Sequence, residues 1–141
     1  MYNIKNIIYI LTILECCEKA WIYTRKFKCA SEFIDSNEQM ELNAVISLFI
    51  AIGEESKKID IELKESVDFE LSWSDIAGLR DKISHNYRGI DADILWIIIH
   101  KDLQKLKTAL LEMVSLLNID KELLGEFMST PHYKNLSYLI K

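Results

Sequence analysis

The sequence predicts an all-α fold, in which a bundle of four main helices is followed by a short C-terminal helical extension. Half of the 141 residues are hydrophobic, and the chain has only one proline and four glycines. So few helix-breaking residues suit long helices with short connections better than a sandwich or a barrel. Apolar residues also recur with the helical period of about 3.6. We therefore expect one helical domain at residues 1–118 and an extension at residues 119–141.

The first helix is expected at residues 3–27. Its apolar residues follow the helical period, beginning with Ile4, Ile7, Ile8, Leu11 and Leu14. Ile10 and Ile13 widen this apolar stripe, so that the helix would be covered on more than one side. Two interpretations of the width remain open: an ordinary buried helix, or a helix that adds a subunit contact to its core contacts.

Residues 28–37 interrupt the pattern and are expected to form a short turn that Phe33 and Ile34 hold against the bundle. A second helix is expected at residues 38–58, because apolar residues follow the helical period again there. Its candidate N-caps are Asp35, Ser36 and Asn37.

Residues 59–72 are expected to be a connection. Their apolar and polar residues alternate as in a strand, but the sequence has no second strand to pair with them. A third helix is expected to begin at Ser72 or Ser74. It should end near Arg88, where Gly89 would supply a left-handed stop.

Asp91 or Asp93 is expected to cap a fourth helix that runs to about residue 117. The apolar residues of this helix keep the helical period over its whole length. In the extension, Asp120 should cap a short helix, which Pro131 ends. The apolar remainder of the extension is expected to dock either on the bundle or on a partner.

The charge balance limits the partners that the chain can bind. The formal net charge is -5, which argues against binding nucleic acid non-specifically through a large basic face. Residues 78–90 have the opposite balance, with a single acid, Asp81. The basic residues of this stretch are Arg80, Lys82 and Arg88. A small local site for phosphate groups is therefore compatible with the acidic chain.

The cysteines and the N-terminal apolar run indicate the cellular compartment in which the protein resides. Cys16, Cys17 and Cys29 are odd in number and include an adjacent pair, so we expect reduced, buried thiols rather than disulfides. No cysteine or histidine spacing indicates zinc, and no cofactor is expected. The apolar run at residues 7–14 is too short to cross a bilayer and lacks the features of a signal peptide. The sequence thus predicts a soluble cytoplasmic protein that has no membrane partner.

One short segment carries most of the reactive side chains, since Arg80, His85 and Tyr87 lie within eight residues. They supply a phosphate-binding cation, a group that exchanges protons near neutral pH, and a phenol. On a regular helix Arg80 and Tyr87 share a face, whereas His85 points about 140° away from Arg80. The arginine and the histidine therefore converge only if the helix loosens, or if a second copy of the chain completes the site in a twofold dimer.

These residue types suit the cleavage of RNA without a metal ion. In that reaction a base removes the proton of the 2′-hydroxyl, an acid protonates the leaving 5′-oxygen, and a cation stabilises the pentavalent phosphate. Two histidines and two arginines at a dimer seam could supply all three groups. The sequence has no carboxylate array of the kind that holds two catalytic metal ions.

Simpler roles remain open for each of these residues. His85 could be only a favourable group at a helix C-terminus, and Tyr87 could lie at the edge of the core. Arg80 could form a surface ion pair with Asp75 or Glu54. Glu54 itself belongs either to a solvated acidic patch or to the site.

The residues around this segment form an ordered pattern along the chain. It consists of Asn43-Ala-Val45, Ile52-Gly-Glu54, Trp73-x-x-Ile76-x-Gly-Leu-Arg-Asp-x-x-x-His85-x-Tyr87, Asp91, Trp96 and Asp102-Leu103. This pattern resembles the HepT-like toxins of the HEPN superfamily. The resemblance covers about residues 4–117, and the extension lies outside it.

The resemblance implies an HEPN-type helical bundle that dimerises and places the segment in the dimer cleft. It implies the toxin of a type II toxin–antitoxin system, a metal-independent endoribonuclease with Arg80 and His85 as the catalytic pair. It also implies that the antitoxin, a minimal nucleotidyltransferase of the MntA type, adds AMP to Tyr87 and can form a larger complex with the dimer. The supporting residues would be Asp81, Lys82 and Glu54.

Asp81 departs from the superfamily pattern, in which the residue after the arginine is often asparagine or another polar residue. An acid at this position would either orient Arg80 or weaken the binding of RNA.

The alternative function is a non-catalytic HEPN module that binds a nucleotide or a protein partner through the same segment.

Overall fold

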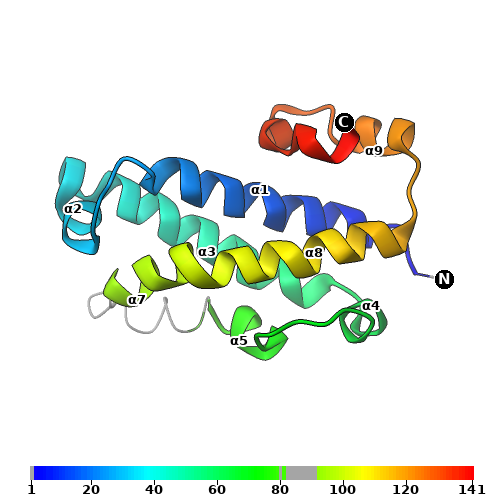
Figure 1. The fold of residues 1–141 in the computed structure, drawn as a ribbon, viewed down its shortest axis with the longest axis horizontal. Helices are drawn as coiled ribbons and strands as arrows, with labels where there is room; N and C mark the ends of the chain where they lie inside the picture. The colour runs from blue at the N-terminus through cyan, green and yellow to red at the C-terminus, as the bar shows by residue number, and fades with distance from the viewer. Residues whose placement is uncertain (1, 80, 82–91) are drawn as a thin grey trace.

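The structure is a computed structural model that describes residues 2–79, 81 and 92–141 (Figure 1). All regular structure among these residues is helical, which confirms the predicted all-α class. The long helices are α1 (Asn6–Thr24), α3 (Met40–Lys58) and α8 (Leu103–Leu117). The shorter ones are α2 (Ala30–Asp35), η1 (Ser36–Gln39), α4 (Ile61–Glu65), α5 (Trp73–Ala77), α7 (Ala92–Ile97), η3 (Ile98–Asp102), α9 (Lys121–Phe127) and η4 (Pro131–Ile140).

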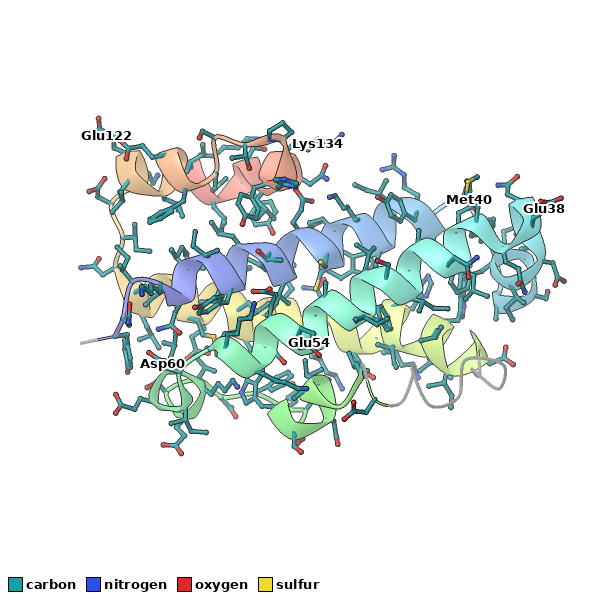
Figure 2. The ribbon with its side chains drawn as sticks, turned by 180° about the vertical axis from the view of Figure 1, so that it is seen from behind. Glu38, Met40, Glu54, Asp60, Glu122 and Lys134 are labelled. Carbon is teal, nitrogen blue, oxygen red and sulfur yellow. The ribbon has the colours of Figure 1, made fainter. Side chains whose placement is uncertain are left out.

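Helix α1 is the centre of the fold, and it is covered on two sides. It packs against α3 and α8 on one side and against η4 on the other, as the front and back views both show (Figures 1 and 2). Its fully buried apolar side chains include Ile7, Ile10, Leu11, Ile13 and Leu14. Burying each such side chain stabilises the fold by about 1.5–3 kcal/mol. Helix α1 is thus covered on more than one side within the chain itself, as the width of its apolar stripe predicted.

The connection between α1 and α3 is more regular than the predicted turn. Residues 30–35 form the helix α2, so the expectation of a simple turn is wrong. Phe33 is fully buried, as expected. Its ring centroid lies 6.0 Å from that of Phe27 and 5.8 Å from that of Trp96. This aromatic cluster ties α2 to α7, the helix that follows the reactive segment.

The predicted start and cap of the second helix are wrong. Helix α3 begins at Met40, because Asn37, Glu38 and Gln39 have φ values of 49°, 55° and 69°. Such left-handed residues cannot continue a right-handed helix. Gln39 occupies the cap position and its side chain makes no capping bond. Instead, the side-chain amide of Asn37 donates to the carboxylate of Glu41, which also pairs with Lys26 at 3.1 Å.

The predicted connection at residues 59–72 contains the short helix α4. The predicted cap Ser72 is confirmed, since its Oγ accepts a bond from the backbone N–H of Asp75 at 3.4 Å. Helix α5 ends at Ala77. The predicted continuation of this helix to Arg88, and its stop at Gly89, lie outside the described residues.

The fourth predicted helix is present as the consecutive elements α7, η3 and α8. Asp93 lies inside the first turn of α7 rather than at its cap, and Asp91 is outside the described part of the chain. The sequence did not reveal that η3 is a π-helical segment. Within it, the indole Nε1 of Trp21 donates to the carbonyl oxygen of Ile99 at 2.8 Å, which joins η3 to α1.

The extension docks on the bundle, which was one of the two predicted alternatives, the other being a partner. As predicted, Asp120 caps α9, with its carboxylate accepting from the backbone N–H of Leu123 at 3.0 Å. In η4, Leu136 is fully buried. The backbone N–H and the side-chain amide of Asn135 donate to the two carboxylate oxygens of Glu15 at 2.9 and 2.8 Å. Glu15 is only 3% exposed, so these bonds satisfy a buried charge on α1.

A second polar contact lies one helical turn further along α1. The hydroxyl of Tyr138 donates to Glu18 at 3.0 Å, and Lys107 pairs with the same carboxylate at 2.8 Å. Burial and the charge of Glu18 raise the pKa of Tyr138 far above its usual value. The phenol therefore stays protonated and keeps donating to Glu18 at any pH that the protein meets.

Replacing Asn135 by alanine is expected to lower the free energy of unfolding by about 1–3 kcal/mol, because it removes a donor from the buried Glu15 carboxylate. Urea unfolding followed by circular dichroism would measure the change. Lys134→Ala is the matched control, since Lys134 is exposed in the same segment, and its effect should stay within about 0.5 kcal/mol. Equal stabilities of the two variants would contradict the role of the contact with Glu15.

Candidate functional site

The structure describes only some of the predicted site residues. Arg80, Lys82, His85 and Tyr87 lie outside the described residues, so their convergence stays a prediction. Asp81 is exposed.

Glu54 lies on α3 and is partly exposed (Figure 2). Its carboxylate is 3.7 Å from the ammonium of Lys57, in an ion pair between residues three apart on the helix. This pair suits a solvated acidic patch, yet it does not exclude a carboxylate that faces the site. Both interpretations of Glu54 therefore remain.

The described residues on either side of the reactive segment are anchored in the core. Leu79 directly precedes Arg80 in the chain and is 8% exposed, and Leu95 in α7 is 5% exposed. Helix α5 packs on α3, and α7 packs on α2. The described residues that flank the segment are thus part of the packed core.

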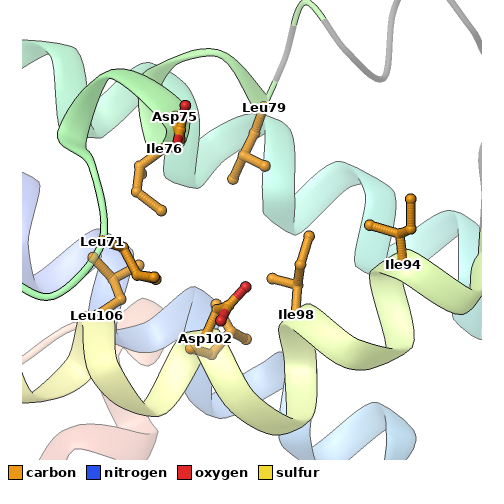
Figure 3. Close-up of a pocket in the computed structure, with 9 residues that line it drawn as sticks. Leu71, Asp75, Ile76, Leu79, Ile94, Ile98, Asp102 and Leu106 are labelled. Atoms are coloured by element: carbon orange, nitrogen blue, oxygen red, sulfur yellow. The ribbon is translucent and has the colours of Figure 1, made fainter.

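A cavity of about 280 Å³ lies between α5 and the helix formed by α7, η3 and α8 (Figure 3). Its lining residues are Leu71, Asp75, Ile76, Leu79, Ile94, Ile98, Asp102, Leu103 and Leu106. Among these described residues, all are apolar except two that carry carboxylates. Asp75 comes from α5 and Asp102 from η3, on opposite walls of the cavity (Figure 3).

The two carboxylates differ in their surroundings. Asp75 is exposed, whereas Asp102 is partly buried. Asp102 directly precedes α8, but its side chain makes no capping bond there. Among the residues that the structure describes, no hydrogen bond or ion pair engages the Asp102 carboxylate. A partly buried carboxylate without a protein partner is satisfied by water or by a ligand.

Sequence reasoning did not identify this cavity. It named Asp75 only as a possible ion-pair partner and Asp102 only as part of the family pattern. A signal was nevertheless present in the row Ile94, Ile98, Asp102 and Leu106, whose members are four residues apart. In this row an acid takes the place of an apolar residue on the inner face of a helix.

Two of the three cysteines, Cys16 and Cys17, do not provide a reactive group in the described structure. Cys16 and Cys17 are buried, as predicted, whereas Cys29 is exposed, which corrects the prediction for that residue. Burial raises the pKa of the Cys16 thiol to about 11 and that of Cys17 further still. Both thiols therefore stay protonated near neutral pH and are poor nucleophiles.

Two kinds of feature are absent from the part of the chain that the structure describes. In residues 2–79, 81 and 92–141, no group of three or more histidine, cysteine or acidic side chains is placed to hold a metal ion. Within the same ranges, no helix combines the length and the apolar character needed to span a membrane.

The chain is similar to known proteins in sequence. A family model described as ribonuclease HepT-like matches residues 13–113. A Thermococcus cleftensis protein named "Probable ribonuclease HepT" is 35% identical over 100 residues, which are 70% of this chain and 86% of that protein. A Methanocaldococcus jannaschii protein, described as a gamma-glutamylcyclotransferase and candidate RNase, is 32% identical over 114 residues, or 81% of this chain.

This chain spans about half the length of the Methanocaldococcus protein, since the aligned residues are 50% of it. No solved structure matches the chain significantly. The family match covers most of the chain and includes the reactive segment from Arg80 to Tyr87. The helical structure agrees with the match, and the chain belongs to the HepT-like ribonuclease family of the HEPN superfamily.

Proposed function

We propose that this chain is a metal-independent endoribonuclease and the toxin of a type II toxin–antitoxin system. One observation carries the proposal: Arg80 and His85 occur, in the order and spacing of the family pattern, inside the matched residues 13–113. The similarity to the Thermococcus protein named "Probable ribonuclease HepT" adds support.

The chemistry assigned to these residues is an internal transesterification. The His85 imidazole of one copy removes the proton of the 2′-hydroxyl, and the resulting oxygen attacks the adjacent phosphorus. The bond between phosphorus and the 5′-oxygen breaks, and the imidazolium of the second copy gives its proton to that oxygen. Arg80 stabilises the negative charge that develops on the phosphate. The products are a 2′,3′-cyclic phosphate and a 5′-hydroxyl.

A homodimer is part of the proposal, because one straight helix cannot direct Arg80 and His85 at the same atom. Twofold symmetry would bring two copies of the segment together. Ile94 and Ile97, on the helix that follows the segment, are 53% and 50% exposed. Apolar residues at this place offer a surface that a second copy would cover.

Tyr87 is the proposed site of inhibition. An MntA-like nucleotidyltransferase antitoxin would transfer AMP to its hydroxyl and could form a larger complex with the dimer. The added group is bulky and negatively charged, so it would repel RNA phosphates beside Arg80. Lys82 would support the binding of phosphate. Asp81 would orient Arg80 or weaken the affinity for RNA.

The test is RNA cleavage by the purified chain in the presence of EDTA. We expect cleavage that leaves 2′,3′-cyclic phosphate and 5′-hydroxyl ends, since no metal ion takes part. The intact mass of the same sample shows whether Tyr87 carries AMP, and a modified sample is treated with phosphodiesterase before the assay. Unmodified protein that binds RNA without cutting it would overturn the proposal and favour a non-catalytic HEPN module.

A further inference from the structure

We propose that the cavity between α5 and η3 receives a guanine base of the RNA and that Asp102 recognises this base. The inference rests on the proposed ribonuclease function and adds a substrate preference to it. It assigns a role to a carboxylate that neither the catalytic mechanism nor the packing of the core uses.

The position of the cavity links it to the proposed catalytic segment. Leu79, which directly precedes Arg80, lines one wall. Ile94, which lies shortly after the end of the segment, lines the opposite wall. An RNA whose phosphate is bound by the segment therefore has its neighbouring nucleotides close to the cavity. A base that turns out of the strand can enter it without displacing the phosphate.

The size and the walls of the cavity suit a single base. Its volume of about 280 Å³ lies just below the range of about 300–1,000 Å³ that is typical of pockets for drug-sized ligands. The flat faces of a base are apolar and its edges are polar. Ile76 and Ile98, on opposite walls of the cavity (Figure 3), can contact the two faces of such a ring.

The chemistry of Asp102 selects among the four bases. A carboxylate only accepts hydrogen bonds, and its two oxygens match two neighbouring N–H donors. Guanine presents such a pair at N1 and N2. In adenine and cytosine a single amino group lies beside an acceptor nitrogen, and in uracil one N–H lies between two carbonyls. Guanine is therefore the base that both carboxylate oxygens can bind.

Asp102 suits this role better than Asp75 does. In Figure 3 the Asp102 carboxylate points into the cavity from between Leu106 and Ile98, and the α5 wall lies opposite. It is partly buried and has no partner among the described residues, so a base with two donors would satisfy it. Asp75 is exposed, which lets water solvate its carboxylate whether or not a base is bound.

The π-helical segment explains why an acid at position 102 faces the cavity. In a regular α-helix, residues four apart drift by about 40° around the axis, so a row of several steps turns away from its starting face. A π-helical turn is wider and contains more residues, which reduces this drift. The segment Ile98–Asp102 thus keeps Ile94, Ile98, Asp102 and Leu106 on the cavity side.

The inference is tested by binding, with short fluorescent oligouridines whose 2′-O-methyl groups prevent cleavage. One central position carries guanosine, inosine or adenosine, and fluorescence anisotropy gives the affinity. We expect the wild type to bind the guanosine probe about tenfold more tightly than the adenosine probe, with inosine between them because it lacks the N2 amino group. Asp102→Asn should remove this preference, because the new amide places a donor opposite the donors of guanine.

Asp75→Asn is the matched control and should keep the preference for guanosine. Asp102→Asn should unfold at the same temperature as the wild type, since its side chain makes no capping bond. Equal binding of guanosine and adenosine by the wild type would overturn the inference. A preference that survives in Asp102→Asn, or that is lost only in Asp75→Asn, would overturn the assignment to Asp102.

The outcomes separate this inference from the proposed function. Cleavage of ordinary RNA without any preference for guanine would leave the ribonuclease proposal standing and reject the base pocket. Guanosine-selective binding together with unmodified protein that never cleaves RNA would support the pocket and reject the catalytic proposal. If the wild type binds none of the probes, the base pocket is rejected, whereas the cleavage of ordinary RNA in EDTA still decides the ribonuclease proposal.

Discussion

Replacing His85 by alanine is expected to reduce RNA cleavage in EDTA by about 10²–10⁴-fold, the usual contribution of a positioned acid or base. In the proposed dimer the substitution removes both proton-transfer groups at once, so the upper part of this range is expected. Initial rates of cleavage of a labelled RNA, compared with the wild type under the same conditions, would measure the loss. Circular dichroism should show unchanged helix content.

His132→Ala is the matched control, because His132 is exposed on η4, on the side of α1 away from α3 and α8 (Figure 1). This variant should cleave RNA at the wild-type rate. Arg80→Ala should also be strongly impaired, since it removes the charge that stabilises the phosphate. If His85→Ala retains the wild-type rate, the imidazole does not transfer a proton in the rate-limiting step, and the catalytic assignment is wrong.

Replacing Phe33 by alanine is expected to lower the free energy of unfolding by about 3–5 kcal/mol. Phe33 is fully buried, and its ring contacts those of Phe27 and Trp96. The substitution leaves a cavity where α2 meets α7, and small proteins have only about 5–15 kcal/mol of stability in total. Urea unfolding of both proteins at equilibrium would give the difference.

Met40→Ala provides the comparison for the Phe33 variant, since Met40 is a large apolar residue that is 63% exposed. Its effect should remain within about 0.5 kcal/mol, because little buried surface is lost. A loss of less than about 1 kcal/mol in Phe33→Ala would mean that α2 is not held by this aromatic cluster. The path of the chain between α1 and α3 would then need another anchor.

The sequence by itself determined the features that depend on neighbouring residues. The long apolar periods predicted α1, α3 and the helix formed by α7, η3 and α8, because the helical period is a local property. Ser72 and Asp120 were identified as caps, since a cap bonds to a backbone N–H only three residues away. The ordered pattern from Asn43 to Leu103, which includes Arg80, His85 and Tyr87, indicated the family, because such a pattern is read directly from the residue order.

Only the tertiary structure decided the features that join distant residues. Glu15 and Asn135 are 120 positions apart, so no local pattern could show that the extension binds the second side of α1. The π-helical segment Ile98–Asp102 is likewise joined to a distant element, since the carbonyl oxygen of Ile99 accepts a hydrogen bond from Trp21 in α1. The cavity that Asp75 and Asp102 share exists only because α5 packs opposite η3. Local hydrogen bonds and periodicity act within about four residues, whereas these contacts depend on how the whole chain packs.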